Sequence, residues 1–465
     1  MKPVLIILLI SHAFSLCFAN EKALDLNISL TQRQDLQWRV RYEFTTPQSA
    51  FFFWRSLGDY RTESWEPISD NVHIGRLNGL DAVWFDKPST TAEFSLTPYT
   101  DIILAEYTPF IKFSDGGFGV FTGQFDVASA SSKHQIALLN GDTQYWEAPP
   151  LRKQLEIRSN QTLVSNGKTN QSVVKDKLNG SGKYIYVGSG EVISNDHFIG
   201  IIDVSMPIWL RAQLNENTPI IFNTLSTLYR HTFSQKIELL YAFKGTDHSG
   251  FSYKGGVLGK NSLVLESSGA LFLNENPRTV HQLQKTLAHE AAHLFQNAQA
   301  QPTSQSDPWI HEGGADAATV YTLHQAALLS SNEVSVEVKK AYTLCSDYLK
   351  QDSLNRSIQN GDQAHYHCGQ IIAYSTAAAL GHHSYFDFWA ELVSNPSVKE
   401  NGYDANSYYQ TMLELGADQQ VVSLIQALVS EPVSNPNEAL SALMLHSGVS
   451  AKFNEQGVLI EFQLP

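Results

Sequence analysis

Residues 289–316 read HEAAHLFQNAQAQPTSQSDPWIHEGGAD, and this stretch holds the most informative pattern in the chain. His289 and His293 are four residues apart, so on a helix they share one face and both imidazole rings can reach a single ion. Glu290 would lie beside that ion without being its ligand. The competing interpretation is a solvated helix face that carries two histidines and no metal.

Signals for the start of a helix precede both ends of this stretch. Asn276 and Pro277 form an N-cap and a first-turn proline, which predict a helix that reaches about Asn297. Asp307 and Pro308 repeat the signal for the next helix. We therefore expect the two ends of the pattern to lie on consecutive helices.

Glu312 is a third candidate ligand, with eighteen residues between it and His293. With this gap, the H-E-x-x-H pattern and the segment WIHEG at 309–313, the sequence resembles the gluzincin zinc metallopeptidases, as found in the aminopeptidase N and glycyl aminopeptidase families. The resemblance implies a thermolysin-like catalytic domain that holds one zinc ion (Zn2+) per chain through His289, His293 and Glu312. Two histidines and one carboxylate leave a fourth position for water, as in catalytic zinc sites.

Hydrolysis of peptide bonds is the reaction that this arrangement favours. Zinc lowers the pKa of its water and polarises the scissile carbonyl, and Glu290 would act as the general base on the zinc-bound water. We therefore predict an exported zinc metallopeptidase whose partner is a peptide or protein substrate. The alternative is a metal-retaining but non-hydrolytic binding or scaffold protein of the same fold, against which the intact Glu290 argues.

A tyrosine further along the chain is the candidate donor to the oxyanion of the tetrahedral intermediate. Aminopeptidase N relatives carry Y-E-K-G on a helix after the third ligand, and its tyrosine is that donor. Here Tyr366 and Gly369 match, while the two residues between them do not. The resemblance implies that Tyr366 is catalytic. Its possible replacements on the same segment are His365, His367 and Tyr374.

Asp316 follows Glu312 by about one helical turn. A carboxylate at this position could accept the free ring N–H of a ligand histidine and fix its tautomer, as an aspartate does in thermolysin-like relatives. The alternative is an exposed charge on the helix surface.

The glycine-rich segment 249–259 can be compared with the motifs that distinguish the aminopeptidase N and glycyl aminopeptidase families. The sequence has no G-A-M-E-N string, whose acidic residue helps to hold the free amino group of a substrate in aminopeptidase N relatives. Glycyl aminopeptidases carry G-G-L-E-H-x-x-S here, and residues 255–262 read GGVLGKNS, with Leu258 in the acidic position. We predict a loop or a glycine-rich hairpin before a strand at 262–266, and no strict requirement for a free amino terminus. The choice between aminopeptidase and endopeptidase stays open.

The rest of the chain sets the domain organisation. Its 465 residues are 43% hydrophobic and 17% charged, the profile of a large globular protein. Alternation of apolar and polar residues predicts strands in the first half, at 38–44, 102–107, 184–187 and 198–204. The polar stretch 158–183 is expected to be an exposed hairpin or loop, and helical patterning prevails from about residue 334.

The predicted fold class is therefore α+β and multidomain. It comprises an N-terminal β-rich domain at 20–212, the thermolysin-like gluzincin catalytic domain at 213–385 and a C-terminal helical region at 386–465.

The N-terminal segment MKPVLIILLISHAFSLCFA predicts a signal peptide over residues 1–19, with an uncleaved membrane anchor as the alternative. No later stretch is apolar and long enough to span a membrane, so we expect a periplasmic or secreted protein. Cleavage would remove Cys17 and leave Cys345 and Cys368, either as one disulfide, which we expect, or as two buried thiols. The net charge of −14 without a basic cluster argues against a nucleic-acid partner.

Overall fold

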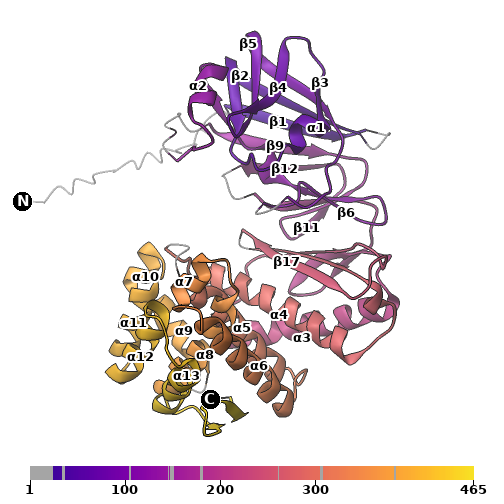
Figure 1. Ribbon diagram of the computed structural model, residues 1–465. Helices are drawn as coiled ribbons and strands as arrows, with labels where there is room; N and C mark the ends of the chain where they lie inside the picture. The colour runs from indigo at the N-terminus through magenta and orange to yellow at the C-terminus, as the bar shows by residue number, and fades with distance from the viewer. Residues whose placement is uncertain are drawn as a thin grey trace, which may run out of the picture.

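The computed structural model describes residues 25–33, 37–103, 106–144, 146, 151–178, 182–259, 261–303, 307–381 and 384–464. The predicted signal peptide at residues 1–19 lies outside the described residues. Strands fill the first half of the chain and helices most of the second, drawn in indigo to magenta and in orange to yellow in Figure 1. The predicted α+β fold class is confirmed. Across the described ranges, no helix is both long and apolar enough to cross a membrane.

The first sheet has eight strands and lies at the N-terminal end of the molecule (Figure 1). Its main path runs β12-β9-β1-β2-β5-β3, with β4 paired to β5 and β8 paired to β2. Along β2, Trp38, Val40 and Tyr42 point into the core and alternate with exposed Arg39 and Arg41, as the period-two pattern predicts.

The strands of this sheet are β1 Leu26–Gln32, β2 Trp38–Phe53, β3 Trp65–Pro67, β4 Val72–Leu77, β5 Leu80–Leu96, β8 Val127–Ala130, β9 Lys153–Arg158 and β12 Val173–Leu178. Its short helical elements are α1 Tyr60–Ser64, the 3-10 turn Thr122–Phe125 and α2 Lys133–Leu138.

The second sheet has the order β11-β10-β13-β7-β6. Its strands are β6 Phe110–Lys112, β7 Phe118–Phe121, β10 Thr162–Ser165, β11 Lys168–Asn170 and β13 Tyr184–Gly188. The strand predicted at 184–187 is confirmed as β13.

One local prediction in this half is wrong and another holds only in part. The hairpin expected within the polar stretch 158–183 is present as β10 and β11, but it is not exposed throughout, because Leu163 and Val164 are buried and β12 joins the first sheet. Residues 102, 103, 106 and 107 form an irregular segment instead of a strand. The apolar residues of this segment do not alternate between two faces of a sheet: Ile103 is buried, while the neighbouring Ile102 is 70% exposed.

The third sheet lies under the second one and has the order β14-β15-β16-β18-β17. Its strands are β14 Val192–Ser194, β15 Phe198–Ile202, β16 Ile237–Phe243, β17 Ser252–Leu258 and β18 Ser262–Ser268. Strands β15, β16 and β18 are parallel, and one sheet face packs on helices while the other packs on the second sheet. Strands β14 and β15 precede residue 213, so this sheet begins ahead of the predicted start of the catalytic domain.

Strand β17 occupies the glycine-rich segment, and its pairing with β18 selects the hairpin over the loop that the sequence also allowed. It pairs with β18 in continuous register from Ser252 opposite Ser268 to Leu258 opposite Ser262, and it forms one edge of the sheet. Glycines lower the intrinsic preference for a strand, so the pairing with β18 decides the conformation here.

The helices cover the third sheet and build the C-terminal part (Figure 1). They are α3 Ile208–Leu228, the 3-10 turn Ala270–Leu273, α4 Pro277–Gln299, α5 Pro308–Gln325, α6 Ser331–Leu349, α7 Leu354–Gln359, α8 Ala364–Ala379, α9 Tyr385–Ser394, α10 Pro396–Asn401, α11 Ala405–Glu414, α12 Gln419–Ser430 and α13 Pro436–His446. A final hairpin consists of β19 Ala451–Phe453 and β20 Leu459–Phe462.

Helices α5 and α8 cross with their backbones almost in contact. A Cβ atom built on Gly313 of α5 would lie 2.3 Å from the Cα atom of Gly369 in α8, so no larger residue fits without moving a helix. This close crossing brings the side chains that flank the two glycines, Glu312 and Tyr366 among them, to the same end of the helix pair.

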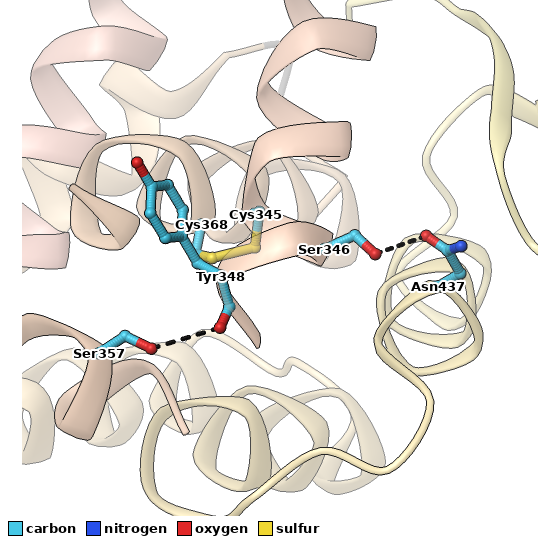
Figure 2. Close-up of a disulfide and its surroundings, with 6 residues drawn as sticks. All are labelled: Cys345, Ser346, Tyr348, Ser357, Cys368 and Asn437. Carbon is cyan, nitrogen blue, oxygen red and sulfur yellow. Dashed lines mark hydrogen bonds between the residues drawn. A yellow bond between two sulfur atoms is a disulfide. The ribbon is translucent and has the colours of Figure 1, made fainter. Parts of the chain in front are cut away.

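The expected disulfide is present. Cys345 of α6 and Cys368 of α8 are bonded, with 4.9 Å between their Cα atoms and a sequence separation of 23 positions. Figure 2 shows the bridge below the ring of Tyr348, next to the hydrogen bonds that tie Ser346 to Asn437 and Ser357 to the carbonyl of Tyr348. Closing a loop of this length stabilises the fold by roughly 3 kcal/mol.

Candidate metal centre

Helix α4 carries the first half of the candidate site. The side chain of Asn276 accepts a hydrogen bond of 3.0 Å from the backbone N–H of Thr279, which caps the helix where the sequence predicts its start. Helix α4 packs against the third sheet and against α5; His289 and His293 lie on its face toward α5, and Glu290 lies toward β17. The expected helix is confirmed and continues two residues beyond Asn297.

Helix α5 brings Glu312 to the two histidines. The Oε2 atom of Glu312 lies 3.2 Å from Nε2 of His289 and 3.0 Å from Nε2 of His293. The two Nε2 atoms are 3.1 Å apart. The three side chains that the spacing pattern singled out therefore meet at one point, and together they form a group that could hold a metal ion.

The outer nitrogen of each ring has its own partner. Nδ1 of His289 donates to Asp316 across 2.8 Å, and Nδ1 of His293 donates to the Oε1 atom of Gln296 across 2.9 Å. Each contact fixes the tautomer and turns the Nε2 lone pair toward Glu312. Asp316 lies where the sequence predicts it. Gln296 was missed, although its place three residues after His293 on the same helix is a usable signal.

This donor set fits a zinc ion. A tetrahedral zinc ion with bonds of about 2.0–2.2 Å holds its ligand atoms about 3.3–3.6 Å apart, a few tenths of an ångström more than the three distances given above. Two nitrogen lone pairs and a carboxylate oxygen that face each other also need a positive charge between them. Burial lowers the pKa of His289, but its hydrogen bonds to Asp316 and Glu312 outweigh burial and raise this pKa to about 10. The cluster therefore favours a cation at this point.

Glu290 lies between the cluster and strand β17. Burial raises the pKa of its carboxyl group, and the nearby His289 and His293 act in the opposite direction. The backbone of β17 touches this side chain, because a Cβ atom built on Gly255 would lie 2.5 Å from both Cγ and Oε1 of Glu290. Any larger residue at position 255 would therefore collide with the Glu290 side chain.

Helix α8 brings Tyr366 to the cluster. Its ring lies 5.8 Å from the ring of His289, and its hydroxyl group donates a hydrogen bond to Glu312. Burial raises the pKa of the Tyr366 phenol, and the charges of Glu312 and Asp316 add to the rise, so the phenol keeps its proton.

The three replacements considered for Tyr366 lie less favourably. His365 contacts the ring of Tyr366 on one side. His367 is stacked on Tyr348, and Tyr374 is fully buried and accepts a hydrogen bond from Gln370. Among the residues named from the sequence, Tyr366 is the tyrosine that the fold brings next to the candidate ligands.

Two more residues beside the candidate ligands, His311 and Tyr403, were not predicted from the sequence. The ring of His311 is stacked on the ring of His293 at 4.3 Å, and its Nδ1 atom lies 2.7 Å from the hydroxyl of Tyr403, which precedes α11. Burial lowers the pKa of His311 to about 3, and the neighbouring His293 contributes, so His311 stays neutral. Through His311 and Tyr403, the C-terminal part of the chain packs against one face of the His293 ring. No local sequence pattern predicts this contact, because the residues are far apart in the chain.

Comparisons with known proteins support the fold through structure alone. No family model and no curated protein sequence matches the chain. An aminopeptidase N family protein from Idiomarina loihiensis superposes with a TM-score of 0.64 at 12% identity, over 89% of this chain and 78% of that protein. Yeast LTA4 hydrolase, solved in complex with bestatin, superposes with a TM-score of 0.51 at 9% identity, over 88% of this chain and 68% of that enzyme. The expected likeness to the aminopeptidase N branch of the gluzincin metallopeptidases is thus confirmed at the level of the fold.

Proposed function

We propose that this chain is an exported zinc metallopeptidase that hydrolyses peptide bonds. The observation that carries the proposal is the convergence of His289, His293 and Glu312 within hydrogen-bond distance of one another, with Glu290 beside them. The fold shared with an aminopeptidase N family protein supports the same reaction class.

The metal and Glu290 have separate tasks in the proposed reaction. A zinc ion held by the two histidines and Glu312 supplies a Lewis acid that polarises the scissile carbonyl and acidifies water. Glu290 is the general base: its carboxylate takes a proton from the attacking water and passes it to the leaving amine.

Tyr366 is proposed to stabilise the oxyanion of the tetrahedral intermediate. Its phenol is protonated at neutral pH, because burial and the surrounding carboxylates raise its pKa. A protonated phenol beside the candidate ligands donates a hydrogen bond to the oxygen on which charge develops.

Strand β17 offers a binding edge to an extended substrate. It is the outer strand of its sheet, and Gly255 lies against Glu290. An extended peptide can add to such an edge through main-chain hydrogen bonds, which would hold the scissile bond next to the general base.

Export to the periplasm or the cell exterior is part of the proposal. The disulfide between Cys345 and Cys368 supports it, because such bonds persist in oxidising compartments. Zinc, at one ion per chain, is the expected cofactor, and a peptide or protein is the expected partner.

The test uses the full mature chain loaded with zinc and a broad peptide library, with cleavage sites read by mass spectrometry. We expect cleavage that a chelator abolishes and added zinc restores. Glu290→Gln is the matched control, since it should bind zinc and cut nothing. A wild-type protein that holds one zinc ion and leaves every peptide intact would establish the non-hydrolytic binding or scaffold role instead.

A further inference from the structure

A cavity of about 460 Å³ lies beside β17. Residues of the third sheet line one side of it, and residues from earlier in the chain, such as Arg55 and Tyr184, line the other. The cavity volume is in the range of small-molecule sites, roughly 300–1,000 Å³, and accommodates an aromatic side chain. Three residues of β17 that face away from α4 line it, namely Lys254, Gly256 and Leu258. The other wall is the irregular segment that contains Ile103, Glu106 and Tyr107.

The interior of this cavity is apolar. Leu258, Val264 and Ile111 are buried and form one cluster with the ring of Tyr184. The hydroxyl of Tyr184 is already used, because it donates a hydrogen bond of 2.7 Å to the backbone carbonyl of Thr108. Tyr184 therefore presents its ring to the cavity, and these walls favour an apolar ligand group.

The two acidic groups that line the cavity are both neutralised by the chain itself. Glu106, whose side chain is 9% exposed, forms an ion pair of 2.8 Å with Arg55. Glu266 forms an ion pair of 3.1 Å with Lys244. A substrate ammonium group would have to displace a guanidinium from Glu106, so the cavity offers little to a positive charge.

One contact links the cavity to the proposed catalytic residues. Gly255 lines the cavity and also touches Glu290, as described above. One residue of an extended peptide advances the chain by about 3.3–3.6 Å, so a side chain within one or two residues of the scissile bond can enter the cavity.

We propose that this cavity is an apolar side-chain subsite without a free carboxylate, formed by β17 together with Ile103, Glu106 and Tyr107. Resting on the proposed peptidase function, it makes the enzyme select peptides with a large apolar residue next to the scissile bond, whether or not the amino terminus is free. Leu258 and the Arg55–Glu106 pair are the residues that set this specificity.

The first test fills the cavity from Gly256. A Cβ atom built on Gly256 meets no atom within 4 Å, and its φ angle is not in the left-handed region, so a side chain there extends into the cavity without strain. The readout is the ratio of kcat/KM for N-acetylated peptides with Phe or Leu to kcat/KM for matched peptides with Ala at the selected position. Wild type should show a ratio of about 10 to 100.

Gly256→Ala, Gly256→Leu and Gly256→Phe should lower this ratio progressively, by about tenfold for the largest residue. Tyr253→Leu is the control, because Tyr253 is exposed on the same strand and outside the cavity, and its ratio should equal that of wild type. A ratio near one in wild type, or an unchanged ratio in Gly256→Phe, would overturn the inference while leaving the peptidase function intact. Failure of zinc-loaded wild type to cut any peptide would instead refute the proposed function.

The second test does not depend on filling the cavity. Arg55→Met removes the guanidinium and leaves the Glu106 carboxylate unpaired, so peptides with a positive charge at the selected position should gain about tenfold over neutral ones. Arg55→Lys keeps a cation beside Glu106 and should behave as wild type. If Arg55→Met shows no new preference for positive charge, the assignment of Arg55 as the group that neutralises Glu106 in this subsite is wrong.

Discussion

The two central glycines of β17 are neighbours in sequence but face two regions built in different ways. Gly255 faces the metal centre, whose candidate ligands come from one stretch of 24 residues on two consecutive helices. Gly256 faces the cavity, whose walls come from separate parts of the chain that include Arg55, Glu106 and Tyr184. Chemistry that depends on helical spacing is therefore encoded locally, whereas the proposed specificity depends on the packing of distant segments.

The strongest way to test the metal-centre side is to remove its general base without disturbing its candidate ligands. Glu290→Gln should fold and hold about one zinc ion per chain, yet lose on the order of 10²- to 10⁴-fold in kcat. Elemental analysis and single-turnover kinetics check both parts. The matched variant His289→Ala with His293→Ala should lose the metal itself. Full zinc content in that double variant, or a tenth of wild-type turnover in Glu290→Gln, would contradict the assignment.

Tyr366→Phe should have the next largest effect. A phenol that donates to the developing oxyanion acts mainly in the transition state, so kcat should fall by about 100- to 1,000-fold with little change in KM. Cys368 lies two residues away on α8 and is bonded to Cys345, so reduction of this disulfide could move the same helix. The oxidation state should therefore be verified by mass spectrometry. A wild-type kcat in the oxidised variant would transfer the donor role to His365, which contacts Tyr366.

The geometry of the candidate metal centre was predicted well from the sequence, because residue spacing on a helix fixes which side chains share a face. A four-residue gap on a helix puts His289 and His293 on one face, and Asn276 with Pro277 marks where that helix begins. Asp316 could be inferred for the same reason, one turn after Glu312. His311 and Tyr403 could not, because their contact joins residues 92 positions apart and depends on how the C-terminal helices pack.

The cavity side was predicted less well, for two physical reasons. The glycine-rich pattern leaves both a loop and a hairpin open, because glycine has a low strand preference, and hydrogen bonding to β18 along the whole strand decides for the hairpin. Alternation around Ile103 predicts a strand that is absent, because alternation cannot separate the wall of a cleft from a strand in a sheet. The substitution of Leu258 for an acidic residue was visible in the sequence, but the ion pair of Arg55 with Glu106 required the fold.

A smaller effect, on zinc affinity, is expected when Gln296 is replaced. Its side chain accepts the hydrogen bond from Nδ1 of His293. Gln296→Met preserves most of the volume but leaves the Nδ1–H group of His293 without its acceptor. Loss of such a supporting contact typically weakens metal affinity by about 10- to 100-fold. Competition with a chelator of known affinity measures this, and thermal unfolding of the zinc-free protein shows whether folding is affected. Unchanged zinc affinity would mean that Gln296 only fills space.

The last prediction concerns the pH dependence of stability at the contact between the second and third sheets, and no change in catalysis is expected. Glu238 of β16 is 2% exposed and accepts a hydrogen bond of 2.8 Å from the backbone N–H of Gly167, in the turn between β10 and β11. Burial raises the pKa of Glu238 from 4.5 to about 7, although the hydrogen bond from Gly167 acts against this rise. The folded protein therefore keeps a proton that the unfolded chain releases between pH 4.5 and about 7.

The free energy of unfolding should consequently fall as the pH rises through this window, and the full loss should be present above pH 7. At about 1.4 kcal/mol per pKa unit, the rise from 4.5 to about 7 corresponds to a loss of about 3.5 kcal/mol. Glu238→Gln keeps an acceptor for Gly167 and never ionises, so it should unfold at higher denaturant concentration than wild type at pH 8.5, while the two proteins should nearly coincide at pH 4.5. The kcat of the variant should equal that of wild type, because Glu238 lies outside the metal centre and the cavity. Equal stabilities at pH 8.5 would show that Glu238 ionises in the folded protein at no cost, and that the contact between the two sheets is better solvated than its burial indicates.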